Sequence, residues 1–383
     1  MAFVTIQNGL YNALAQGLGL NRQTFQIIQP AAPLLAGDNR FLWNFFNNIP
    51  PRSLTQNYIA SGGNQLFSNY IALMGALSPA TEVDLEGDIG ADNLRAFIDF
   101  VKTISPPPPI NQYPDIFFGW AFLNAPDVAN VGATDWAAIL LDPILTGQRA
   151  VLPYLPTPAP NPTPGLPPDW LLGYDQLVAQ LQNAPSFSFS LDSSTMNTDV
   201  SNTWTGGDHS GVFGLWSGSD SSESISTQFS ESNFEFQLSF GNVLQFQTNA
   251  GAWYSSSTLN QAIDNPDVDP PWRSAGTLIN WGNTFGDDGN MQRVAVSLLV
   301  VDTMSVFLDA ETQYSTFEQQ TIQNNSSAGV WPFYTTNSSG ATTTTTTFDD
   351  AGGLHVENHG IPGVPVVIGG NVLPIDRFLG RTV

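Results

Sequence analysis

Two of the three histidines in this 383-residue chain lie close together, in the segment GGLHVENHG. On a β-strand, His355, Glu357 and His359 point to the same side, because successive side chains alternate between faces. The two histidines would then stand about 13 Å apart at ~3.3 Å per residue, too far to share one metal ion. The pattern predicts a transition-metal site on His355 with Glu357, or on Glu357 with His359, with Asp208 and His209 of GGDHSG as candidate partners. A polar turn with hydrogen-bonded histidines is the simpler alternative.

The acidic loop IDNPDVDPPW offers a second metal chemistry. Asp264, Asp267 and Asp269 lie within it, and calcium binds several oxygen ligands of the kind that such loops supply. No lysine or arginine occurs between Arg149 and Arg273, so a bound cation would meet little competition from the chain. The loop predicts a calcium site, but it does not match the EF-hand pattern, and solvated turns explain the same residues.

Sequence patterns of common enzyme families are missing. The chain has no G-x-S-x-G elbow and no P-loop, and the absence of cysteine excludes thiol catalysis. An enzymatic interpretation therefore depends on the histidine segment, as a metal-dependent enzyme that uses His355, Glu357 and His359.

The charge composition excludes some partners. Thirty-three acidic and ten basic residues give a net charge of −23, yet charged residues are only 11% of the chain. In a soluble domain, charged residues usually make up about 25% of the chain. The net negative charge therefore comes from the small number of lysines and arginines and not from an excess of acidic residues. Nucleic acid and anionic membranes would be repelled, whereas cationic partners and divalent metal ions remain compatible.

Two further patterns suggest binding functions. Seven of the ten tryptophans lie from the proline-rich segment onward, and tryptophan beside Asp, Asn and Gln is typical of sugar-binding faces, although most tryptophans are core residues. They are Trp170, Trp204, Trp216, Trp253, Trp272, Trp281 and Trp331. The serine-rich stretch 186–232 alternates small polar and apolar residues, as the inserting hairpins of pore-forming toxins do.

The candidate site residues lie in a part of the chain that predicts strands and turns. From Ser186 onward the hydrophobic period is two, as in Phe234, Phe236, Leu238 and Phe240, which is typical of half-buried strands. The threonine run 342–347 predicts a strand at a sheet edge.

The N-terminal part of the chain has helical periodicity instead. Predicted helices cover residues 3–18, 66–77, 92–101, 115–123 and 134–141, with Asp92 as the N-cap of the third, and another covers 174–181. The proline-rich segment 154–170 predicts an extended strap, since proline removes amide donors and fixes φ.

These patterns predict an α+β fold. A helical domain is expected over residues 1–150, a proline-rich strap with a short helix over 151–185, and an antiparallel β-sandwich or barrel-like domain over 186–383.

The function that the sequence favours is non-catalytic binding or self-assembly, through protein partners, other copies of the chain or glycans. The metal-dependent enzyme and a pore-forming or glycan-binding β protein are the alternatives. No secretory signal and no membrane-spanning run is recognisable. We therefore expect a soluble protein, cytoplasmic or exported by a route without a signal peptide.

Overall fold

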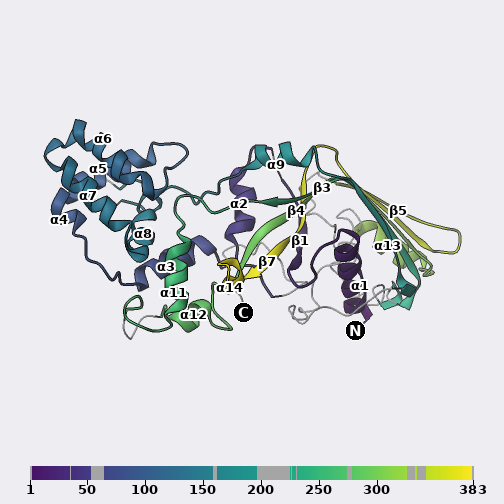
Figure 1. Cartoon of the computed structure of the whole chain (residues 1–383). Coiled ribbons are helices and arrows are strands. Elements are labelled where there is room, and N and C mark those ends of the chain that lie inside the picture. Colours follow the sequence, from purple (N-terminus) through teal and green to yellow (C-terminus); the bar gives the residue numbers. More distant parts are fainter. Residues whose placement is uncertain are drawn as a thin grey trace. The chain divides into compact units, whose positions relative to one another are not determined.

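The computed structural model confirms a mixed α+β fold with an antiparallel sheet (Figure 1). The residues that the structure describes are 2–34, 36–52, 64–157, 162–195, 225, 227–229, 231–273, 278–325, 333 and 342–381. They divide into two compact units, each built from three segments of the chain. The sheet unit comprises Met1–Gly63, Leu172–Gln247 and Ala295–Leu373, and the helical unit comprises Asn64–Leu171, Thr248–Val294 and Pro374–Val383. The predicted segments 1–150, 151–185 and 186–383 are contiguous, and their separate folding stays a prediction.

The sheet unit contains one seven-stranded antiparallel sheet in its described residues. The strands are β1 (Phe25–Pro33), β2 (Phe187–Asp192), β3 (Phe234–Gln247), β4 (Arg293–Ala310), β5 (Thr342–Phe348), β6 (Leu354–Gly360) and β7 (Val366–Pro374). Their order is β1-β7-β4-β3-β2, while β6 also pairs with β4 and β5 pairs with β6. Over these strands the sheet does not close into a barrel, so that part of the fold prediction is wrong: β2 pairs with β3 and β5 pairs with β6, each on one side only.

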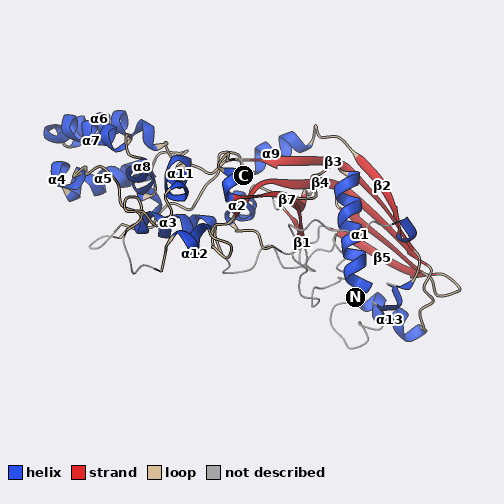
Figure 2. Cartoon of the chain, turned by 60° about the horizontal axis from the view of Figure 1, so that its bottom comes forward, coloured by secondary structure: helices blue, strands red, loops and turns tan. Residues whose placement is uncertain are grey.

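Helix α1 (Ala2–Gly17) lies across one face of this sheet, which we call the inner face (Figure 2). The helices of the unit also include α2 (Asn39–Asn47), α9 (Tyr174–Leu181) and α13 (Thr316–Asn325), which confirms the predicted helix at 174–181. Leu10, Tyr11 and Leu14 of α1 and Ile322 of α13 join the alternate, inward side chains of β3 in one buried core. Burial of this apolar surface is the main term that holds helix and sheet together.

Of the edge strands β5 and β1, the first was predicted from the sequence and the second was not. The threonine run forms β5, an edge strand as expected. β1 was not predicted, because its sequence FQIIQPAAP contains two prolines and does not alternate. Proline is tolerated there because β1 lies at the end of the sheet, and its register with β7 shifts between Ile27 and Ala32.

The helical unit consists of short helices. They are α3 (Leu66–Ala76), α4 (Leu85–Ile89), α5 (Ala91–Lys102), α6 (Tyr113–Asn124), α7 (Ala129–Ile139), α8 (Pro143–Ala150), α11 (Ser256–Asp264), α12 (Trp281–Phe285) and α14 (Ile375–Phe378), with 3-10 turns at Ile110–Gln112, Pro126–Val128 and Leu152–Tyr154. Phe97, Tyr113, Phe117 and Trp136 are fully or almost fully buried in its core, and their rings pack mostly edge to face. In the described residues no single helix has the length and hydropathy of a membrane span; the bent pair Pro126–Ile139 and Pro143–Tyr154 reaches them together.

The N-cap predicted for α5 is wrong. The cap is Gly90, whose φ of 84° also ends α4, so α5 begins one residue before Asp92. Glycine suits this left-handed position because it has no Cβ. The Asp92 carboxylate instead accepts from Arg95, one turn further along the helix.

The proline-rich strap folds back on itself where an extended course was predicted. The Thr157 N–H donates to the Thr163 carbonyl and the Leu166 N–H to the Pro153 carbonyl, both at 3.0 Å. A Cβ on Gly165 would lie 2.1 Å from the Tyr154 carbonyl oxygen. Amide donors that the prolines leave therefore bind acceptors close by in the chain, and the Thr163 N–H likewise donates to the Thr157 hydroxyl. Its residues 158–161 lie outside the described part of the chain.

An Asp135→Asn substitution on α7 is expected to stabilise the protein slightly at neutral pH. Burial, and next the nearby carboxylate of Asp88, raise the pKa of Asp135 above its ordinary value. The ionised form therefore costs stability, and that cost disappears as the pH falls through the raised pKa. Because Asp135 is still partly exposed, we expect a gain below about 1 kcal/mol, measured by thermal unfolding at several pH values. Asp127→Asn, which removes a charge at an exposed position, is the control. A gain that persists at acidic pH would contradict this account.

Candidate functional site

Five strands of the sheet unit place polar side chains on one open surface. We call this surface the outer face and define it by three rows that run across β2, β3, β4, β6 and β5 in register. The rows are Asp192–Glu235–Asp309–His355–Thr347, Ser190–Gln237–Phe307–Glu357–Thr345 and Ser188–Ser239–Ser305–His359–Thr343. Residues directly opposite each other in antiparallel strands share a face, so all these side chains lie on the same side.

Burial follows the same alternation. In β3 the outer-face residues Glu235 and Gln237 are exposed, whereas the intervening Phe236 and Leu238 are buried in the core. In β6 the buried Val356 and Asn358 alternate with the three histidine-segment residues in the same way. The prediction that His355, Glu357 and His359 share one face of a strand is therefore confirmed.

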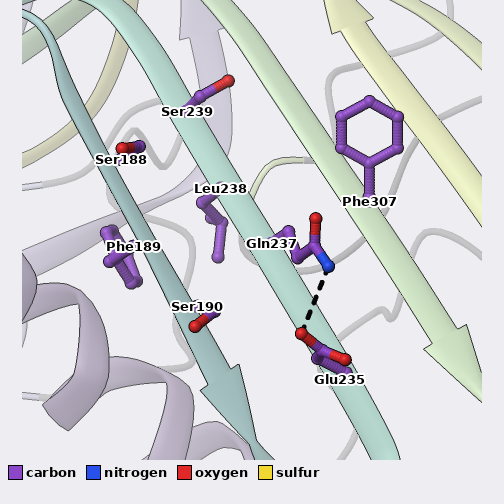
Figure 3. Close-up of a pocket in the computed structure, with 8 residues that line it drawn as sticks. All are labelled: Ser188, Phe189, Ser190, Glu235, Gln237, Leu238, Ser239 and Phe307. Carbon is purple, nitrogen blue, oxygen red and sulfur yellow. Dashed lines mark hydrogen bonds between the residues drawn. The ribbon is translucent and has the colours of Figure 1, made fainter.

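A shallow groove of about 440 Å³ lies over β2, β3 and β4. It is lined by Ser188, Phe189, Ser190, Glu235, Gln237, Leu238, Ser239 and Phe307. In Figure 3 the serines of β2 flank it, the Gln237 amide donates to the Glu235 carboxylate at 3.2 Å, and the Phe307 ring stands on the neighbouring strand. The groove thus combines hydroxyls, an amide and a carboxylate with the apolar residues Phe189, Leu238 and Phe307.

His355 is held between two carboxylates. Its Nδ1 lies 2.5 Å from the carboxylate of Asp309, its cross-strand neighbour, and its Nε2 lies 3.9 Å from that of Asp349. The N–H of Gly353 lowers the pKa of the Asp349 carboxyl most, and the N–H of Ala351 and the charge of His355 lower it further. The lowered pKa favours the anionic form of Asp349 beside the imidazole.

His359 contacts a serine, a carboxylate and an aromatic ring. Its Nδ1 lies 3.1 Å from the Ser305 hydroxyl, its Nε2 lies 3.6 Å from the Glu357 carboxylate, and its ring meets Phe307 edge to face at 5.5 Å. Serine, histidine and glutamate are the residue types of an acyl-transfer triad. Such a triad also needs N–H donors for the oxyanion, but β4 pairs with β3 on one side and with β6 on the other at Ser305, which engages its backbone amides.

Of the predicted ligand pairs, the structure brings Glu357 and His359 together, with the Nε2 of His359 3.6 Å from the Glu357 carboxylate. Over the described part of the chain no three His, Asp or Glu side chains gather closely enough to hold a metal ion. Asp208 and His209 lie outside the described residues, so a transition-metal site that includes them stays a prediction.

The predicted calcium loop follows α11 in the helical unit. The carboxylate of Asp264, the last residue of α11, forms an ion pair with Arg381. Asp267 adopts a positive φ of 54°, and Asp269 precedes two prolines. Calcium binding here stays a prediction, and a lower melting temperature after chelation is the result that would support it.

Of the seven tryptophans that suggested a sugar-binding face, four lie in the described residues, and all four belong to the helical unit. Trp170, Trp253 and Trp272 are buried, and the Trp253 indole donates to the Asp169 carbonyl at 2.9 Å. Trp204, Trp216 and Trp331 lie outside the described residues, as does most of the predicted pore-forming hairpin, residues 196–224. Trp170, Trp253 and Trp272 are core residues, so they cannot form the exposed sugar-binding face that was predicted.

Sequence reasoning missed Phe307, Ser305 and Gln237. Phe307 lies between Val306 and Leu308, whose side chains face the core. An aromatic residue at an outward-facing position of an alternating strand is the sequence signal that could have identified Phe307 as a candidate binding residue.

Comparison with protein-family models, with curated proteins and with solved structures finds no match for this chain.

Proposed function

We propose that this chain is a non-catalytic binding protein and that the outer face of its sheet binds a neutral oligosaccharide. The observation that carries the proposal is the composition of the three rows, in which hydroxyl, amide, carboxylate and imidazole groups surround one partly exposed aromatic ring.

The polar groups fit a ligand rich in hydroxyls. Serine and threonine hydroxyls both donate and accept, Gln237 does both through its amide, and carboxylates such as Glu235 accept only. Each sugar hydroxyl likewise donates one hydrogen bond and accepts others. The hydroxyls of an extended oligosaccharide could therefore replace their hydrogen bonds to water by hydrogen bonds to these side chains along a row of the sheet.

The aromatic ring and the charge narrow the ligand class further. Phe307 is the aromatic residue of the rows, and the flat C–H side of a pyranose can pack on its ring as other apolar groups do. None of the residues in the rows is lysine or arginine, while Asp192, Glu235, Asp309 and Glu357 are acidic. Sulfated or phosphorylated sugars would meet unscreened carboxylates, so a neutral sugar is favoured.

The pairing of β4 on both sides at Ser305 favours binding without turnover. The strand amides near this hydroxyl lie within two β-ladders, so they are committed to the sheet and cannot stabilise developing charge.

Isothermal titration with neutral hexasaccharides of glucose, xylose and N-acetylglucosamine tests the proposal, with a heparin hexasaccharide as the anionic comparison. We expect one neutral class to bind in saturable fashion and to be recovered uncleaved, and heparin not to bind. Absence of binding across a broad array of neutral glycans would contradict the proposal. Labelling of Ser305 by a fluorophosphonate, or cleavage of a bound sugar, would contradict its non-catalytic part.

A further inference from the structure

The edge strand β5 has the properties of a surface that pairs with another strand. Among the described residues β5 pairs only with β6, in continuous register from Thr342 opposite Gly360 to Phe348 opposite Leu354. Proteins usually protect such edges with charged residues, proline or bulges. The sequence TTTTTTF contains no charge and no proline, and its register with β6 contains no bulge.

We propose that β5 is a dimer interface, at which β5 of a second copy of this chain pairs in antiparallel fashion and extends the sheet. A run of identical residues is complementary to itself, because antiparallel pairing about Thr345 sets threonine opposite threonine over most of the strand. Cross-strand threonine pairs are favourable in sheets, and a two-fold axis makes the contact the same for both copies.

Two buried hydroxyls support this partner. The Oγ1 atoms of Thr344 and Thr346 are buried on the inner side of β5 and have no hydrogen-bond partner in the described residues. Pairing about Thr345 sets Thr344 of one copy opposite Thr346 of the other. The two-fold axis repeats this pair, so one such pair lies on each side of the axis. The hydroxyls of such a pair can hydrogen-bond to each other, which would satisfy groups that are costly to leave unpaired.

Charge selects the antiparallel arrangement. Asp349 and Asp350 directly follow β5. Parallel pairing would set these carboxylates of the two copies side by side, whereas antiparallel pairing moves them to opposite ends. The central contact carries no charge, so the net charge of −23 per copy acts there only over longer, screened distances.

Dimerisation would also double the outer face. A two-fold axis perpendicular to the sheet keeps Thr345 and the outer-face rows of both copies on the same side. A ligand that spans both copies would then bind with a higher effective concentration at the second site. The dimer does not depend on the identity of that ligand.

Sedimentation equilibrium of the full-length chain and its variants tests the proposal. We expect the native chain to dimerise in a concentration-dependent manner, and Thr345→Lys and Thr345→Asp each to weaken dimerisation at least tenfold, because like charges would stand directly opposite. An equimolar mixture of the two variants is expected to restore the dimer. Within one chain Glu357 lies opposite Thr345, so the lysine variant should be the better tolerated, and circular dichroism checks that both fold.

Ser190→Lys and Ser190→Asp are the matched controls, because Ser190 is exposed on the outer face of the other edge strand, β2. They should leave dimerisation unchanged. A monomeric native chain at all concentrations, equal effects at both edges, or a mixture that stays monomeric would each overturn the proposal. Sedimentation is run without sugar, and sugar binding is measured separately on the native chain, so failure of dimerisation is distinguished from failure of the outer-face function.

Discussion

An Asp142→Ala variant is expected to lose about 3 to 5 kcal/mol of folding stability, because four backbone N–H groups would lose their acceptor. Asp142 is the buried N-cap of α8. Its Oδ1 accepts from Ile144 and Leu145 at 2.8 and 3.2 Å, and its Oδ2 accepts from Ala80 and Thr81 at 2.9 and 3.0 Å. One carboxylate therefore connects the loop before α4 to the start of α8.

The two oxygens make a graded test possible. Asp142→Asn keeps one acceptor oxygen, so it can satisfy only one of the two N–H pairs. Its folding stability should therefore lie between that of the native chain and that of the alanine variant. Asn280→Ala is the control, since Asn280 caps α12 of the same unit through a single bond, from the Asn283 N–H at 2.9 Å, and should cost about 1 kcal/mol. Urea unfolding followed by circular dichroism measures all three. Equal losses for Asp142→Ala and Asn280→Ala would show that the connection to the loop adds nothing.

Local patterns predicted the elements of this fold well where burial is one-sided. The helical stripe at 66–77 and the alternation in Phe234–Phe240 each indicate which side chains face a core. Helix α3 was therefore predicted close to its bounds and β3 from its first residue, although β3 continues to Gln247. The strap was predicted with the wrong course, because proline stiffness says nothing about which carbonyl will accept from Thr157 or Leu166.

Strand neighbours could not be predicted in the same way. β4 lies between β3 and β6, and the contact of Ser305 with His359 joins residues 54 positions apart. No periodic pattern encodes that separation, because it depends on which strands exclude the most water together. The histidine segment was therefore recognised with the right face, but the serine and the aromatic ring beside it were not.

Replacing Phe307 by alanine is expected to weaken neutral-oligosaccharide binding at least tenfold, equivalent to about 1.4 kcal/mol. Aromatic side chains dominate binding energy where they sit among polar neighbours that exclude water, and Phe307 stands between Gln237 and Glu357 in the middle row of the outer face. The ring is partly exposed, so its removal should cost less stability than truncation of a buried phenylalanine. Loss of binding without loss of fold is thus the expected combination.

Two comparison variants isolate the role of the ring. Phe307→Tyr keeps an aromatic surface and should retain binding within a few-fold, whereas Phe317→Ala removes a more exposed phenylalanine of α13 that lies outside the three rows and should have no effect. Titration calorimetry with the hexasaccharide that binds the native chain measures the affinities, and thermal unfolding checks each variant. If Phe307→Ala bound as tightly as the native chain, the ligand would not pack on the Phe307 ring, and the role proposed for the aromatic side chain would be wrong. If Phe307→Tyr also lost binding, the contact would depend on the edge-to-face packing of Phe307 with His359, since that packing is what an added hydroxyl would disturb while the aromatic surface remained.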